Sequence, residues 1–529
     1  MTKIYNILRA LFVTVFAFAI IGPLVLYLVL SVSGVQRGVG DIAENELSKL
    51  LGADVEIGNV DFAPFNKLTL KNVIVRDSLN DTILRADRIG AGIVMSKLLV
   101  KRRLIFSYAE ILGLEARLWK DSANAPLNIQ PIIDRLSSKD DNKPPAQYDL
   151  RINNIVIRKA GIRYDVLSEP HLNRFDKNHI EISDIKADIY LPEIRNDNYR
   201  IDLKRIALKE RSGLYVESLS GKILITDTLV AVDDFDLKLS ESRIALGPIA
   251  LHCSSLKNLG REIFDIPVEL EFLPGSRIST SDAVPFVPQL DAQWVSLALN
   301  GKMSGRISDL DVHSFSAQTP NGGIDFQLKG KVSGLPDIKA LEVELPEMEL
   351  SVKPSRYLPL ITSFVGDNRN LLGLISRVGD FRYSGVFDGK LNEAVCDGHL
   401  ATAIGSVDVD AAYRLDSITG SRFLLGNIDI DSFDLGTLLD KKDFGTLSAS
   451  IDADAVLKGG EVNGDFDINL DRFIFKDYEY GNATFHGNVD KRRIDGAFTV
   501  DDDNVKVKLE GWADFSEKML TCDVEGYVK

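Results

Sequence analysis

A strict alternation of apolar and polar residues recurs through most of this 529-residue chain and constrains its fold more than any other feature. Residues 447–455 (LSASIDADA) alternate without a break, and residues 505–510 (VKVKLE) do the same. Successive side chains of a β-strand point to opposite faces, so each segment predicts a strand with one apolar and one polar face. Glycine-containing turn signals between these segments predict antiparallel hairpins and meanders.

Helical patterns are few. Residues 39–51 (VGDIAENELSKLL) have helical spacing and are followed by Gly52 in the position of a C-terminal cap. Residues 355–378 (SRYLPLITSFVGDNRNLLGLISRV) predict one or two short amphipathic helices, which either cover an apolar surface or form an ordinary surface insertion. Strands do not alternate with long helical patterns, so a parallel βαβ sheet is not expected.

An uncharged stretch of 23 residues, 10–32, is long enough to cross the hydrocarbon core of a bilayer as a helix. Lys3 and Arg9 precede it, and Arg37 followed by acidic residues comes after it. The excess of basic residues on the near side predicts a cytoplasmic N-terminus and an exported remainder. A cleavable signal peptide ending near residues 31–34 (SVSG) is the alternative to an uncleaved anchor.

Composition excludes some classes of function. The net charge of −15 and the lack of a basic stripe argue against nucleic-acid binding. Cys253, Cys396 and Cys522 are odd in number and far apart, so we predict small buried side chains rather than a disulfide framework.

No catalytic, cofactor or metal site is predicted, and we do not expect an enzyme. The histidines are scattered singly; His171 and His179 are the closest pair, and they lie in a polar loop without a helix to align them. Aspartates at i, i+2 spacing, such as Asp452 and Asp454, fall on the solvent face of strands and match no calcium-loop pattern. Short patterns such as Asp77-Ser-Leu leave O-glycosylation open.

Several motifs indicate a family. The order is a strand pair, then ADRI (86–89), MSKLLVKRR (95–103) and AEILGLEARL (109–118), followed later by LNGKMSGRISDL (299–310) and GKVSGLPD (330–337). This order, with a single N-terminal anchor, resembles the AsmA-like superfamily, in particular the TamB-type translocation and assembly module proteins. The likeness covers most of the chain, although each motif is loose and driven by glycine.

The resemblance implies a mostly β protein: an N-terminal transmembrane helix followed by an elongated antiparallel β-sheet coiled into a U-shaped groove, with short helical insertions. It also implies anchorage in a bacterial inner membrane and movement of phospholipid, or help in assembling outer-membrane proteins. The chain lacks the family's C-terminal domain, which engages an outer-membrane β-barrel partner, so that function is not carried over.

The predicted organisation has seven parts. They are a transmembrane anchor (1–33), a juxtamembrane helix (34–52), an N-terminal AsmA-like β module (53–136), a linker (137–148), groove repeats (149–354), a helical insertion (355–378) and further groove repeats (379–529). Because residues 524–529 (VEGYVK) still have a strand-like pattern, we expect the repeats to continue in a longer protein.

A sheet with one apolar face must bury that face against a second sheet or an apolar ligand. The candidate residues lining a lipid groove are the inward alternates Leu447, Ala449, Ile451, Ala453, Ala455, Phe466, Ile468, Leu470, Val505, Val507 and Leu509. Three hypotheses follow: a conduit for phospholipid or another acyl-chain lipid, a scaffold that offers a strand edge to outer-membrane proteins, and an envelope protein with ordinary sandwich cores. Alternation alone does not separate a groove from a sandwich.

Overall fold

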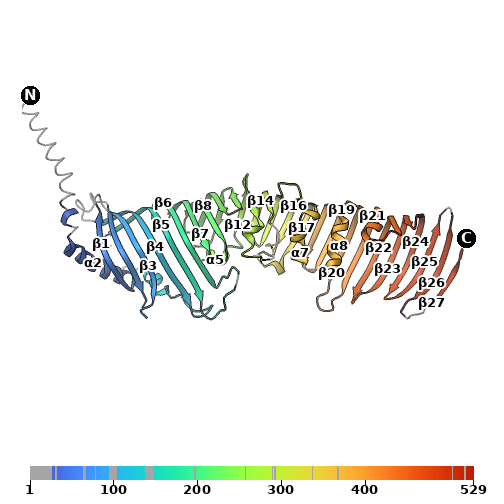
Figure 1. Ribbon diagram of the computed structural model, residues 1–529, viewed down its shortest axis with the longest axis horizontal. Helices are drawn as coiled ribbons and strands as arrows, with labels where there is room; N and C mark the ends of the chain where they lie inside the picture. The colour runs from blue at the N-terminus through green and yellow to red at the C-terminus, as the bar shows by residue number, and fades with distance from the viewer. Residues whose placement is uncertain are drawn as a thin grey trace, which may run out of the picture. The chain divides into compact units, whose positions relative to one another are not determined.

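The computed structural model describes residues 25, 27–29, 32–63, 67–77, 79–93, 104–137, 148–172, 174–195, 198–256, 258–288, 290, 294–335, 337–365, 368–502, 504–516 and 520–529. In these residues the chain is mostly β, with long antiparallel ladders and few helices (Figure 1). The predicted fold class is confirmed at this level. The predicted anchor (1–33) lies largely outside the described residues. Among the described helices, none combines the length and apolar composition that crossing a bilayer requires.

The chain forms two compact units. The first comprises Met1–Arg243 and Pro285–Pro288, and the second comprises Ile244–Val284 and Gln289–Lys529. The elements of the first unit are α2 (Ser33–Leu51), β1 (Asp54–Ala63), β2 (Lys67–Arg76), β3 (Thr82–Ile93), β4 (Leu104–Lys120), α4 (Gln130–Ser137), β5 (Tyr148–Val166), β6 (His179–Arg195), β7 (Asn198–Glu210), β8 (Tyr215–Ile225) and β9 (Leu229–Leu239).

In the first unit, helix α2 packs along β1, and within the described residues β1 pairs with β2 alone. Ser48 Oγ accepts a hydrogen bond from the Val55 amide at 3.1 Å, and Glu44 Oε1 accepts one from the Ile57 amide at 2.7 Å. These side chains satisfy amides that would otherwise project unpaired from the edge of the sheet. The helix ends at Gly52, whose φ of 66° is the left-handed conformation of a C-terminal cap.

A hydrophobic core lies between α2, α4 and the first strands. Ile83 and Ala86 of β3 are almost completely buried, at 1% and 0% exposure, and Leu47 of α2 packs against the same cluster. The buried members are Val55, Ile57, Val60, Val73, Val75, Ile83, Ala86 and Ile132. This part of the sheet therefore has its apolar face covered by helices of its own chain.

One pair of strands departs from the antiparallel prediction. β4 and β5 pair in parallel, with Ile111 opposite Ile157. Parallel neighbours need a crossover connection, and the segment between these strands contains α4. The expectation of a wholly antiparallel sheet is wrong here, because a crossover returns the chain to the end of the sheet where β4 began. Residues 138–147 of the predicted linker lie outside the described part of the chain.

The second unit continues as an antiparallel meander from β14 to β27, in which each strand pairs with the next along the chain. Its strands are β10 (Arg243–Leu246), β11 (Ile249–His252), β12 (Pro267–Phe272), β13 (Arg277–Ser279), β14 (Ser296–Arg306), β15 (Asp309–Gln318), β16 (Ile324–Ser333), β17 (Glu342–Val352), β18 (Phe381–Lys390), β19 (Glu393–Thr402), β20 (Gly405–Leu415), β21 (Arg422–Asp434), β22 (Phe444–Lys458), β23 (Glu461–Phe475), β24 (Tyr478–Asp490), β25 (Arg493–Asp501), β26 (Lys506–Asp514) and β27 (Thr521–Val528).

Short helices lie between strands of the second unit. They are α5 (Leu259–Glu262), α6 (Thr280–Ala283), η2 (Ile338–Ala340), η3 (Pro354–Arg356), α7 (Leu358–Val365), α8 (Arg369–Val378) and α9 (Leu435–Leu439). Three of these, η3, α7 and α8, occupy the region of the predicted helical insertion between β17 and β18 (Figure 1). Tyr357 anchors them: it is 5% exposed, and its hydroxyl donates to Asn321 Oδ1 at 2.9 Å.

Candidate functional site

The apolar alternates of the strands from β20 to β26 align into continuous rows across the second unit. Residues directly opposite each other in adjacent strands share one face, so the register defines each row. Ile468 of β23, for example, stands opposite both Ile451 of β22 and Phe485 of β24. The complete row is Val409, Ile428, Ile451, Ile468, Phe485, Phe498 and Leu509.

Three further rows lie beside this one. They are Val407, Ile430, Ala449, Leu470, Ala483, Val500 and Val507; Ala411, Gly426, Ala453, Phe466, Gly487, Gly496 and Gly511; and Tyr413, Leu424, Ala455, Gly464, Val489, Ile494 and Ala513. We call these four rows the apolar face. It extends across seven strands without a charged side chain.

The register brings most of the sequence-predicted groove residues onto this face. Leu447 lies outside the four rows, but it extends the apolar face because it stands opposite Phe473 in β23. Val505 is the exception, because it lies before β26, in a turn where its amide donates to Asp502 Oδ1 at 2.7 Å. The predicted residues on the rows are Ala449, Ile451, Ala453, Ala455, Phe466, Ile468, Leu470, Val507 and Leu509.

Large and small residues of the apolar face differ in burial. Ala449, Ala453 and Ala455 are 2–4% exposed, whereas the larger side chains of the same strands are half-buried and Phe498 is 39% exposed. In the described residues, strands β18–β27 make extensive contacts only with their hydrogen-bonded neighbours, apart from one between β22 and α9. Apart from Val500, which is 7% exposed, the larger side chains of this face keep part of their surface accessible.

Small residues on this face have a packing role. A Cβ atom on Gly464 would lie 2.2 Å from the carbonyl oxygen of Asp454 and 2.6 Å from the Cα atom of Ala455 in the next strand. Real Cβ atoms do not come so close to backbone, so only glycine fits. Neighbouring strands thus approach closely on the side of the sheet that carries the apolar residues.

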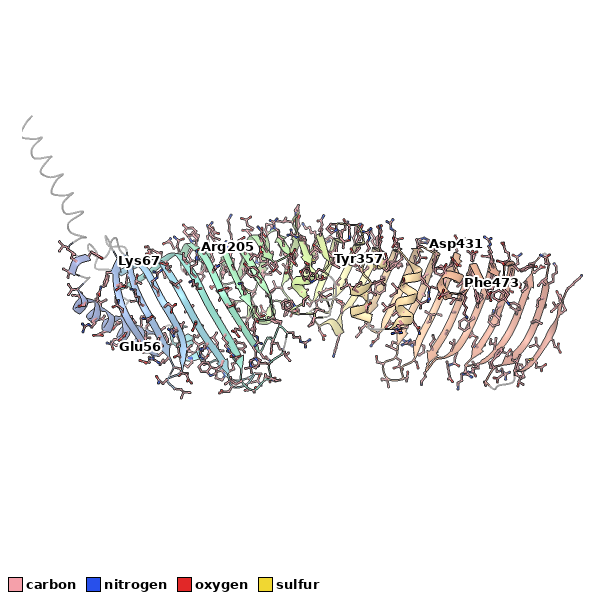
Figure 2. All side chains as sticks on the ribbon, viewed as in Figure 1. Glu56, Lys67, Arg205, Tyr357, Asp431 and Phe473 are labelled. Atoms are coloured by element: carbon pink, nitrogen blue, oxygen red, sulfur yellow. The ribbon has the colours of Figure 1, made fainter. Side chains whose placement is uncertain are left out.

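Aromatic side chains gather where β22 begins, β23 ends and β24 begins, a cluster that sequence reasoning missed. Phe473, labelled in Figure 2, lies with its ring centroid 6.1 Å from that of Phe444 and 6.4 Å from that of Tyr480. Tyr478 extends the cluster, at 4.6 Å from Tyr480. Burial, and the hydrogen bond that its hydroxyl donates to Asp502, hold the pKa of Tyr478 above its ordinary value. The signal in the sequence was the aromatic alternation FIFKDYEY (473–480).

The opposite face of the same strands is acidic. Asp452 stands opposite Asp467, and Asp454 stands opposite Asp465. Asp467 also faces His486, whose Nδ1 is 3.2 Å from Asp467 Oδ2. The sheet thus carries apolar and acidic faces back to back, as the alternation predicts.

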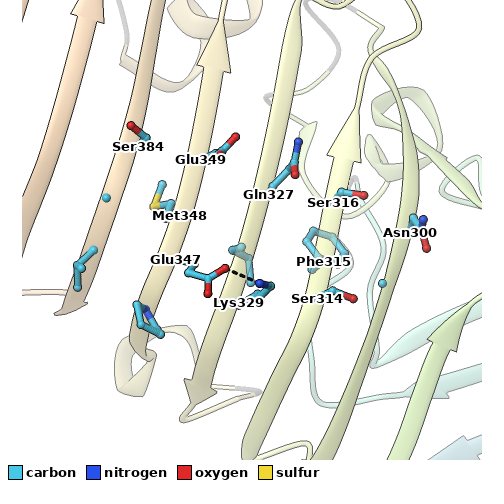
Figure 3. A pocket seen from close by; sticks show the side chains of 15 residues that line it. Asn300, Ser314, Phe315, Ser316, Gln327, Lys329, Glu347, Met348, Glu349 and Ser384 are labelled. Carbon is cyan, nitrogen blue, oxygen red and sulfur yellow. Dashed lines mark hydrogen bonds and ion pairs between the residues drawn. The ribbon is translucent and has the colours of Figure 1, made fainter.

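A shallow depression of about 480 Å³ lies on the polar face farther toward β14. Figure 3 shows polar side chains from successive strands crossing it, among them Gln327, Glu349 and Ser384, with an ion pair between Lys329 and Glu347. The ladders of these strands are irregular at this place, for example between Leu345 and Met348. Such bulges bend a strand locally, which accounts for the hollow.

Comparison with known proteins identifies no relative: no family model, no curated protein and no solved structure matches the chain. The resemblance to the AsmA-like superfamily rests on the motifs and their order, and it stays a prediction.

Proposed function

We propose that this protein carries phospholipid, or another acyl-chain lipid, along its apolar face. In this proposal residues 10–32 anchor it in a bacterial inner membrane, its N-terminus is cytoplasmic and the bulk of the chain lies in the periplasm. Lipid moves toward the outer membrane in support of envelope biogenesis, and no catalytic step is involved.

One observation carries the proposal: four parallel apolar rows continue over seven strands, and their larger side chains other than Val500 are half-buried or exposed. Monomeric soluble proteins rarely leave a contiguous apolar surface of this extent without a partner. Each CH₂ kept from water contributes about 0.8 kcal/mol, so an acyl chain gains by lying on the rows. Because every row continues on the next strand, an acyl chain can move along the sheet from strand to strand without being exposed to water.

The close approach of backbones at Gly464 and Ala455 supports a coiled sheet with the apolar residues on its inner side. A U-shaped groove of this kind shelters acyl chains while headgroups project outward. The acidic opposite face favours the same arrangement, since it repels anionic headgroups.

A photocrosslinking experiment tests the proposal. The full chain is produced in bacteria grown with ³²P-phosphate, with p-benzoylphenylalanine at position 498 or at position 499. Phe498 and Thr499 are consecutive residues of β25 on opposite faces. We expect illumination to attach labelled phospholipid at position 498 and not at position 499.

Equal labelling at both positions, or none at position 498 in chains that remain folded by circular dichroism, would overturn the conduit. A second measurement needs no probe: the amount of phospholipid that co-purifies with Phe498→Glu should fall several-fold, whereas Thr499→Glu should retain the wild-type amount.

A second candidate function is strand addition to an outer-membrane β-barrel protein. Within the described residues β27 pairs with β26 alone, and every residue of β27 is exposed. Lys506 and Lys529 exchange both backbone hydrogen bonds, so by alternation the amide of Val524 points away from β26. Val524→Pro removes an outward donor and should block strand addition. Unchanged assembly of outer-membrane proteins in cells that carry this variant would exclude the scaffold.

A further inference from the structure

Three potential metal ligands converge in the first unit, where the loop between β5 and β6 folds back on the strands. Asp165, near the end of β5, pairs in register with His179, the first residue of β6. His171 comes from the loop itself. One ligand atom from each of the three side chains lies within 4.8 Å of the others.

The hydrogen bonds of His179 determine what its ring can do. The imidazole is 3% exposed, with Nε2 2.9 Å from the carbonyl oxygen of Glu169 and Nδ1 3.0 Å from Asp165 Oδ1. A carbonyl oxygen only accepts, so Nε2 carries a proton and donates it. Nδ1 then faces a carboxylate oxygen at hydrogen-bond distance, so it either carries a second proton or, in a neutral ring, directs its lone pair at a cation that both atoms bind.

Metal-binding histidines commonly have this arrangement. A ligating imidazole usually donates its other ring N–H to a carbonyl or carboxylate, which fixes the tautomer and the orientation of the ring. The Glu169 carbonyl supplies that acceptor for His179. Arg163 holds the second carboxylate oxygen of Asp165 at 2.8 Å, which leaves Oδ1 as a single ligand atom directed at Nδ1.

His171 completes the set from the solvent side. Its exposed ring lies with its centroid 3.7 Å from that of His179, at an angle of 31°. The loop that presents it is fixed by Asp176, which is 3% exposed and accepts hydrogen bonds from the amides of Leu172 and Asn178, each at 3.0 Å. The third ligand is therefore held beside the other two and open to an ion arriving from solution.

We propose that Asp165, His171 and His179 bind one Zn²⁺ ion, with water in the fourth position. Two imidazole nitrogens and one carboxylate oxygen match the ligand preferences of zinc, and three protein ligands leave one position of a tetrahedron open. The ion would take the place between Nδ1 of His179 and Oδ1 of Asp165 and would fasten the β5–β6 loop to both strands.

Zinc titration of the full chain tests this. The purified protein is stripped with EDTA, desalted and titrated with Zn²⁺ in competition with a chromophoric chelator, and thermal unfolding is followed with and without the metal. We expect one equivalent of Zn²⁺ per chain and a higher unfolding temperature with zinc. Replacement of an exposed ligand, His171→Ala, should weaken binding at least 10-fold.

The matched control is His313→Ala, which removes an exposed histidine that hydrogen-bonds to Ser304 at 2.8 Å in the second unit. This variant should bind zinc as the wild type does. A His171→Ala variant that binds Zn²⁺ as tightly as the wild type, or a wild type that binds no Zn²⁺, would overturn the proposal. Because His171 lies in an exposed loop, its removal leaves the strands paired. Asp165→Asn gives an independent second variant, expected to lose the same equivalent.

Discussion

Gly487 of β24 and Gly496 of β25 stand directly opposite each other, so closely that a Cβ atom on Gly496 would lie 2.7 Å from the Cα atom of Gly487. Gly511 of β26 continues the same row. No side chain fits between backbones at this separation, so glycine is the residue that permits it. The row crosses the apolar face.

The first prediction concerns this contact. In Gly487→Ala the new methyl group would meet the Asp495 carbonyl oxygen at 2.4 Å, and the strands must separate. We expect a loss of about 1–3 kcal/mol in the free energy of unfolding, measured by urea denaturation. Gly481→Ala in the same strand is the control, since its nearest neighbour is at 3.4 Å. Equal effects of the two substitutions would show that the close approach imposes no constraint.

The sequence predicted the strands well because period two is a local property. The alternation from Leu447 to Ala455 places Ala453 and Ile451 on one face in any antiparallel pairing, and the register of β22 with β23 agrees. It did not reveal the parallel pairing of β4 with β5, because alternation describes the faces of a strand and not its neighbour.

The candidate surface was predicted only in part, for a related reason. Phe473 was missed because the ladder between β22 and β23 shifts register near Ser448, and a shift of this kind changes which residues share a face. His171 and His179 were not predicted as ligands because they lie in a polar loop without a helix to align them. Only the folded β5–β6 connection brings both of them to Asp165.

The second prediction concerns the acidic face. Asp452 lies directly opposite Asp467, and like charges in that position repel. Asp452→Asn should therefore raise the free energy of unfolding by about 0.2–1 kcal/mol at low ionic strength, and the gain should vanish in 1 M NaCl. Asp501→Asn is the control. The carboxylate of Asp501 lies 2.5 Å from Lys506 Nζ, so removing its charge relieves no repulsion between carboxylates. A gain that persists at high salt would contradict the electrostatic explanation.

The third prediction concerns pH. Glu110 accepts hydrogen bonds from Lys67 at 2.6 Å and Arg88 at 3.0 Å, and these bonds hold its pKa below the ordinary value of 4.5. A lowered folded-state pKa contributes stability above the unfolded-state pKa, and this is lost as the pH falls through the folded-state value. Glu110→Gln should therefore destabilise the first unit at pH 7, by about 1 kcal/mol, and have a smaller effect near pH 3. The comparison requires urea denaturation at both pH values; an equal loss at both would exclude a role for the carboxylate charge.

The fourth prediction contrasts a covered part of the sheet with an open one. Ile83 is 1% exposed beneath α2 and its neighbours, whereas Ile468 is half-buried on the apolar face. Truncating a core isoleucine removes apolar contacts and leaves a cavity, so Ile83→Ala should lose about 2–5 kcal/mol. At Ile468 the removed methyl groups were already partly in water, so Ile468→Ala should lose distinctly less. Hydrogen–deuterium exchange of the amides of β3 and β23 reports each substitution in its own unit. If both substitutions lowered protection equally, the apolar face would be a closed core, and lipid would have no place on it.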